Sequence, residues 1–239
     1  MSFQRASLEE ALRTLGAVLE ARATPYAVLV VGGSNLLLLG LVDRSTADLD
    51  VIALKEGEHY RRLHGIPGPL ARAAEEVADA LGIAAGWLND GPASLMDLGL
   101  PPGWEERVDV RRFGALEVHL TSRFDQVCFK LYAAIDRGPR DKHVADLVAL
   151  EPSREELLEA ARWTTTHDPS PALRTSLVQC LAHLGVEEPD AVSIRPPCRR
   201  ARTGRSPPTS SGSAGAPGPS SACPRGGAPT RAGQSIRSR

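Results

Sequence analysis

The residues best suited to bind phosphate and metal lie between Gly32 and Asp50. Gly32, Gly33 and Ser34 directly follow an apolar run, and Asp48 comes 15 positions after Gly33. Two glycines let backbone N–H groups approach phosphate oxygens, and the Ser34 hydroxyl adds a donor at the same place. A helix that begins at this turn adds partial positive charge. We therefore predict that Gly32, Gly33 and Ser34 bind a phosphate group.

Asp48 and Asp50 open a second apolar run, residues 48–54, which reads as a strand. Residues i and i+2 of a strand project to the same face, with α-carbons about 7 Å apart. We predict that this carboxylate pair holds Mg²⁺ or Mn²⁺.

The pattern of apolar residues predicts an α/β fold, with a small mixed sheet first and helices after it. Ser7 to Glu10 have the spacing of a capping box, which places the start of the first helix at Ser7. The helices expected are 7–23, 35–41, 67–83, 123–136, 142–150, 153–167 and 171–184, and the strands are 26–31, 48–54, 107–113 and 116–121. The predicted domains are a core at 1–122, a helical region at 123–192 and a tail at 193–239.

This order of strand, glycine turn, helix and Asp-x-Asp strand resembles the nucleotidyltransferase superfamily. Within it, the chain is most similar to bacterial proteins related to abortive-infection (AbiEii-like) and toxin–antitoxin nucleotidyltransferases. A second matching segment runs from Asp125 through Lys130 to Asp146. The resemblance implies that Lys130 neutralises phosphate charge and that Asp146 or Asp141 supplies a later acidic group. Polymerase-like members also carry a third carboxylate on a neighbouring strand. Glu117 is the best candidate for this metal ligand, since its apolar neighbours face the other side of a predicted strand, and Asp109 is a weaker one. Trp87 to Gly91 also matches, without an assigned role.

The resemblance implies a magnesium-dependent enzyme that moves a nucleotide from a nucleoside triphosphate to an acceptor hydroxyl. The acceptor would be RNA, such as transfer RNA, or a protein side chain. A cognate toxin or antitoxin protein is an expected partner. The alternative is a non-catalytic, antitoxin-like binding protein with the same fold. Lys130 could also simply extend from a buried helix, and His143 is expected at the surface.

Charge is distributed unevenly along the chain. Residues 193–239 contain nine Arg and no Asp or Glu, which leaves 19 basic and 29 acidic residues before them and a net charge of −10. An acidic body argues against a broad nucleic-acid-binding face. The tail is rich in Pro, Gly and Ser and is expected to be disordered, either as a genuine basic tail or as the product of a shifted reading frame. No membrane association is expected, and the predicted location is the cytoplasm.

Overall fold

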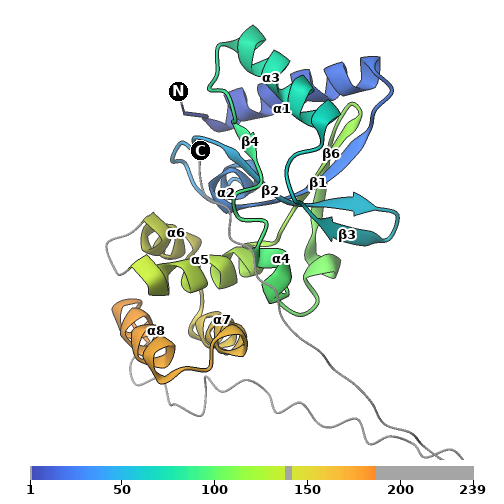
Figure 1. Cartoon of the computed structure of the whole chain (residues 1–239). Coiled ribbons are helices and arrows are strands. Elements are labelled where there is room, and N and C mark those ends of the chain that lie inside the picture. Colours follow the sequence, from blue (N-terminus) through green and yellow to red (C-terminus); the bar gives the residue numbers. More distant parts are fainter. Residues whose placement is uncertain (1, 138–141, 187–239) are drawn as a thin grey trace, which may run out of the picture. The chain divides into compact units, whose positions relative to one another are not determined.

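A six-stranded mixed sheet lies at the centre of the computed structural model, which describes residues 2–137 and 142–186 (Figure 1). The strand order is β3-β2-β1-β6-β5, and β4 pairs separately with β2. β1 runs parallel to β6 and antiparallel to β2. The strands are β1 (Tyr26–Val31), β2 (Leu49–Glu56), β3 (His59–Arg62), β4 (Leu88–Asn89), β5 (Asp109–Phe113) and β6 (Leu116–Leu120).

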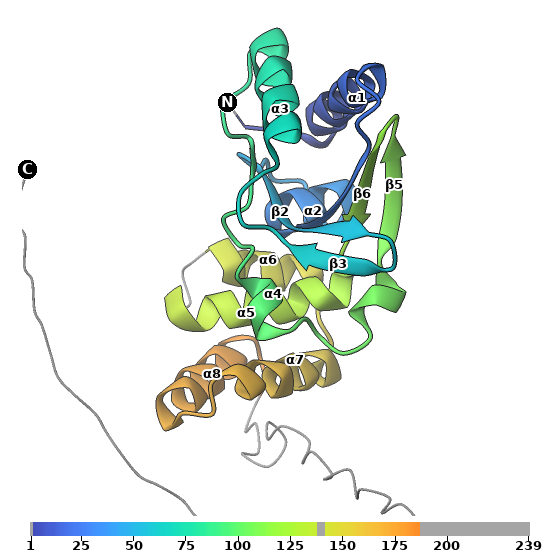
Figure 2. The same cartoon turned by 45° about the vertical axis from the view of Figure 1, so that its right-hand side comes forward.

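Helices lie above and below this sheet in the two views. Figures 1 and 2 show α1 beside α3 at the top, while α5 to α8 gather below the sheet, where α5 contacts α2. The helices are α1 (Arg5–Ala21), α2 (Gly32–Leu39), α3 (Gly68–Leu81), α4 (Leu95–Leu98), a short 3₁₀ helix η1 (Trp104–Arg107), α5 (Arg123–Arg137), α6 (Lys142–Leu150), α7 (Arg154–His167) and α8 (Pro171–His183). The predicted α/β class, with the sheet first and helices after it, is confirmed. The described residues belong to one compact unit, and the predicted boundary at residue 122 stays a prediction.

Several predicted elements differ from the observed ones in detail. The first helix begins at Arg5, and Ser7 occupies its third position, where the hydroxyl accepts a hydrogen bond from the Gln4 N–H at 3.0 Å. Prediction of Ser7 as the cap was therefore wrong, because Gln4 precedes the helix instead. The strands β3 and β4 were not predicted, since one is polar and the other has only two residues. The predicted tail at 193–239 lies outside the described residues.

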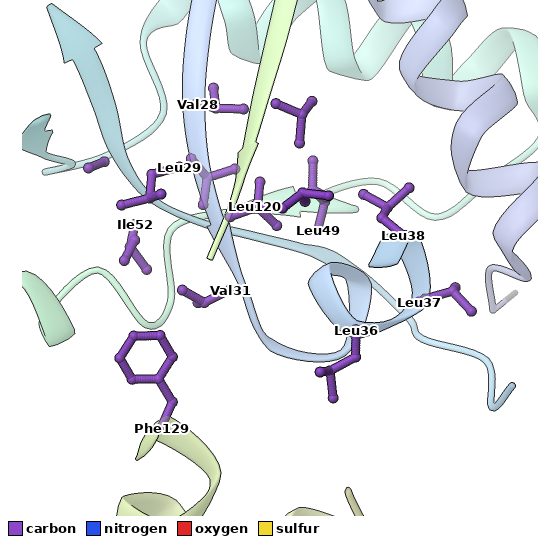
Figure 3. Packing of buried hydrophobic residues seen from close by; sticks show 14 of the residues in the cluster. Val28, Leu29, Val31, Leu36, Leu37, Leu38, Leu49, Ile52, Leu120 and Phe129 are labelled. Atoms are coloured by element: carbon purple, nitrogen blue, oxygen red, sulfur yellow. The ribbon is translucent and has the colours of Figure 1, made fainter. Parts of the chain in front are cut away.

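The central strands are buried on both faces. Val28 to Val31 are all at most 2% exposed. The buried leucines of α2, Leu36 to Leu38, pack against β1 and β2. Figure 3 shows Phe129 pointing from α5 toward Val31 and Ile52, so the helical half joins the core directly below the end of β1. His119 is also buried, at 2% exposed, because Tyr60 of β3 packs against it with its hydroxyl 2.7 Å from Nδ1, whereas Glu117 on the same face is partly exposed. Within the described residues, no helix is both long and apolar enough to cross a membrane.

Candidate active site

The glycine turn, Gly32 and Gly33, forms the start of α2 directly after β1 and lies against the aspartates. Gly32 has a φ of +79°, a left-handed conformation that glycine adopts without strain. A Cβ at this position would lie 2.6 Å from Asp50 Oδ2, so only glycine lets the carboxylate approach the turn. At Gly33 a Cβ would lie 3.0 Å from Thr46 Oγ1 and 3.2 Å from Arg44 Nη2. Both glycines thus make room for polar side chains at the start of α2.

A register shift in the sheet brings Asp50 to this turn. Leu29 pairs with Ala53 but Val30 pairs with Val51, so Ile52 is an extra residue on β2. Such a bulge bends the strand and redirects its side chains. Asp50 consequently lies opposite Val31, the last residue before the glycines.

Asp48 and Asp50 line a cavity of about 340 Å³ together with Gly32 and Gly33. Burial raises the pKa of Asp50 above its ordinary value, and the negative charge of Asp48 raises it further. Two carboxylates that repel each other at the mouth of a cavity are a suitable donor set for a divalent cation. Mg²⁺ is typically held by one or two carboxylates, with the remaining ligands from water and substrate phosphates. The residues present therefore fit Mg²⁺ or Mn²⁺.

β4 supplies a residue that orients this pair. Asn89 lies beside Asp50 in the register of β4 and β2. Its amide oxygen accepts a hydrogen bond from the Gly91 N–H at 2.9 Å, so its amide nitrogen is the group that donates to Asp50. The buried Trp87 anchors the segment through a hydrogen bond from its indole N–H to the carbonyl of Ala74. The Trp87 to Gly91 segment, which sequence reasoning left without a role, thus holds an amide against the aspartate.

A cluster of charged residues includes Arg44 and Lys130, which also line the cavity. Arg44 donates two hydrogen bonds to Asp146, at 2.6 and 2.7 Å, and Lys130 Nζ lies 2.7 Å from the same carboxylate. Asp146 and Lys130 are only 1% and 4% exposed. Burial alone raises the pKa of Asp146, but the Arg44 hydrogen bonds and the Lys130 charge outweigh it and hold the pKa below its ordinary value. Asp146 therefore fixes two cations beside the glycine turn.

The structure does not bring every predicted residue to the cavity. Glu117 pairs with Arg112 at 2.8 Å, and it lies opposite Ala27, four residues before Val31 on β1 and so about 13 Å along the strand from Asp50. Asp109 is exposed and contacts Arg111. Ser34 is fully buried, with its hydroxyl 3.5 Å from the Val31 carbonyl. Asp141 lies outside the described residues.

Four residues that line or support the cavity were not assigned there from the sequence: Arg44, Thr46, Asn89 and Gln126. Arg44 had one available signal, because it is the only Lys or Arg between Arg22 and Lys55. Lys142 and His143, at the start of α6, also line the cavity.

Comparison with protein families identifies the family of this chain, although no curated protein and no solved structure matches it. A family model described as "Nucleotidyltransferase of unknown function (DUF6036)" matches residues 7–151, which is more than half of the chain and includes every element around the cavity from the glycine turn to α6. The chain therefore belongs to this nucleotidyltransferase family.

Proposed function

We propose that the protein is a metal-dependent nucleotidyltransferase that moves a nucleotide from a nucleoside triphosphate to an acceptor hydroxyl. One observation carries the proposal: a carboxylate pair and a group of cations meet at a glycine turn within a single cavity. The carboxylates are Asp48 and Asp50, and the cations are Arg44, Lys130 and Lys142.

The cations favour a polyanion at the start of α2. The N-terminus of a helix carries partial positive charge, so cations gathered there repel it unless an anion binds between them. Asp146 is the counter-charge bound to Arg44 and Lys130, and Lys142 adds a third positive charge on the cavity wall. When a divalent metal offsets the charge of Asp48 and Asp50, the remaining positive charge and the open backbone of Gly32 and Gly33 suit a triphosphate.

The carboxylates would bind the metal and accept the proton of the acceptor hydroxyl. Asp48 and Asp50 would hold Mg²⁺ or Mn²⁺, which polarises phosphoryl oxygens and neutralises developing charge. In the proposed reaction the acceptor oxygen forms a bond to the α-phosphorus of the nucleotide. The bond from that phosphorus to the bridging oxygen breaks, and pyrophosphate leaves with the electron pair. Asp50 accepts the proton of the acceptor hydroxyl, and Lys130 and Arg44 stabilise the charge on the leaving pyrophosphate.

A non-catalytic, antitoxin-like binding protein is the second candidate, and one observation favours it. Within residues 2–137 and 142–186, no group of three His, Cys, Asp or Glu side chains forms a metal cluster. Polymerase-like relatives place a third carboxylate beside the pair, whereas Glu117 lies elsewhere here. A protein of this kind would bind a cognate partner without transferring nucleotides.

Transfer of label distinguishes the two candidates. The full chain is incubated with each α-³²P nucleoside triphosphate and Mg²⁺ in the presence of total RNA and total protein. The Asp48→Asn/Asp50→Asn double variant runs alongside, and Asp79→Asn, an exposed aspartate on α3, is the matched control. The proposal expects label on RNA or protein with wild type and Asp79→Asn but not with the double variant. Absence of label from every fraction with folded wild type would support the non-catalytic candidate.

A further inference from the structure

Gln126 is a buried amide in the wall of the cavity that the proposed reaction leaves without a role. It lies in the first turn of α5, one helical turn before Lys130, and it is completely buried. Residues four apart on a helix share a face, so Gln126 and Lys130 belong to the same wall. Both line the cavity with Phe129, which lies between them in the sequence.

The hydrogen bonds around Gln126 show which atom of its side-chain amide, the nitrogen or the oxygen, faces Thr121. Gln126 Nε2 lies 2.7 Å from Thr121 Oγ1. The Thr121 hydroxyl has two further neighbours, the Val30 carbonyl at 3.3 Å and Asn35 Oδ1 at 3.4 Å. Asn35 in turn donates its amide nitrogen to the Thr121 carbonyl, so its oxygen is the end that faces the hydroxyl.

A hydroxyl group has one proton to donate, and two acceptors already compete for it here. In the structure the Gln126 nitrogen donates to Thr121, whose own proton is directed to the Val30 carbonyl or the Asn35 oxygen. The amide oxygen of Gln126 is left at the other end. It is buried, and no residue in the described part of the chain donates a hydrogen bond to it.

A buried acceptor without a donor is costly, and nearly all such groups in folded proteins are paired. The triphosphate cannot supply the missing donor, because its oxygens are acceptors near neutral pH. The nucleoside carries the donors of the substrate, namely the sugar hydroxyls and the N–H groups of the base. The same cavity suits a nucleoside, since Phe129, Tyr132, Pro92 and Leu95 also line it and offer aromatic and apolar surface.

We infer that Gln126 is a specificity-determining residue whose amide oxygen accepts a hydrogen bond from the nucleoside of the bound triphosphate. The inference rests on the proposed function and adds to it which part of the substrate lies toward the start of α5. Gln126 lines the cavity although its amide oxygen is buried, so a nucleoside in the cavity reaches the oxygen through a side-chain adjustment of the kind that commonly accompanies binding. A nucleotide that lacks the matching donor leaves this acceptor unpaired.

Equilibrium binding to the full chain tests the inference. Isothermal titration in Mg²⁺ compares the four ribonucleoside triphosphates with their 2′-deoxy and 3′-deoxy forms, and with inorganic tripolyphosphate. Wild type is expected to bind the nucleotide with the matching donor about 5- to 150-fold more tightly than the analogue without it. The deoxy series identifies a sugar hydroxyl as the donor, whereas a difference among the four bases identifies a base N–H.

Variants separate the acceptor from its surroundings. Gln126→Met keeps a similar volume without polar atoms and is expected to abolish this discrimination while leaving the affinity for tripolyphosphate unchanged. Gln126→Glu keeps an acceptor oxygen and is expected to retain the discrimination. Circular dichroism checks that each variant folds.

Two results would overturn the inference. Gln126→Met could bind all nucleotides with the relative affinities of wild type, or it could lose affinity for nucleotides and tripolyphosphate equally. Failure of the proposed function gives a different result, in which wild type binds neither nucleotides nor tripolyphosphate. The two failures are therefore distinguishable in one set of titrations.

Discussion

Replacement of Asp146 by asparagine tests the charge cluster beside the glycine turn. The substitution keeps the shape of the side chain and removes its charge. Asp146 is 1% exposed, receives two hydrogen bonds from Arg44 and lies 2.7 Å from Lys130 Nζ. The variant therefore leaves the buried ammonium group of Lys130 without its counter-charge.

The expected cost follows from the burial of Lys130, which is 4% exposed. Removal of one partner from a buried ion pair costs about 3–5 kcal/mol. Arg44 adds little to this figure, because its side chain is 39% exposed and can turn toward water. Urea unfolding at pH 7, followed by circular dichroism, should thus show a loss of about 3–5 kcal/mol with an unchanged slope.

The double variant Asp146→Asn/Lys130→Met provides the internal control. It removes the unpaired charge of Lys130 as well as the charge of Asp146, so it should be more stable than Asp146→Asn alone. A loss below about 1 kcal/mol in the single variant, or a double variant no more stable than the single one, would refute the reasoning.

The same cluster predicts a dependence on pH. The hydrogen bonds from Arg44 and the charge of Lys130 outweigh burial and hold the pKa of Asp146 below its ordinary value. A lowered carboxyl pKa contributes stability above the ordinary pKa of about 3.9, and this contribution is lost as the pH falls through the folded value. The difference in unfolding free energy between wild type and Asp146→Asn should shrink below about pH 4, and a constant difference would contradict the assignment.

Two further predictions concern Gly32 and His119. Gly32→Ala should cost about 1–2 kcal/mol from its positive φ and weaken Mn²⁺ binding measured by electron paramagnetic resonance, because the new Cβ would lie 2.6 Å from Asp50 Oδ2. Gly57→Ala, also at positive φ but with open space around it, should keep full Mn²⁺ affinity, and equal losses in both variants would argue against the contact with Asp50. Burial lowers the pKa of His119, so wild type should lose stability as the pH falls below about 6.5. His119→Gln should lack that loss when melting temperatures are compared at pH 5.5 and 7.5, whereas identical pH profiles would exclude His119 as its source.

Elements with strong local patterns of apolar residues could be predicted from the sequence. β1 has the predicted bounds, Tyr26–Val31, and α6 has the predicted bounds, Lys142–Leu150. Apolar periodicity identified these segments because each buries a continuous set of side chains. β3 was not predicted, because His59–Arg62 is a polar strand at the edge of the sheet, where one side lacks a neighbouring strand.

The candidate site was less predictable, because it depends on distances between elements. The glycine turn and Asp-x-Asp are close in sequence, and the strand order brings them together. Arg44 and Asp146 are 102 positions apart, and no local pattern indicates that they meet. Alternation along residues 116–121 places Glu117 on a face of the sheet but does not give its position along the strand, which is four residues from the end of β1 where the cavity begins.

Nucleotide binding that depends on both metal and carboxylates is the most direct test of the site. Isothermal titration of the full chain with nucleoside triphosphates should show binding in Mg²⁺ that is lost in EDTA and in Asp48→Asn/Asp50→Asn but kept in Asp79→Asn. Such a result would place the metal, the triphosphate and the carboxylate pair in one site. Binding that is unaffected by EDTA and by the double variant, or no binding by folded wild type, would contradict the account.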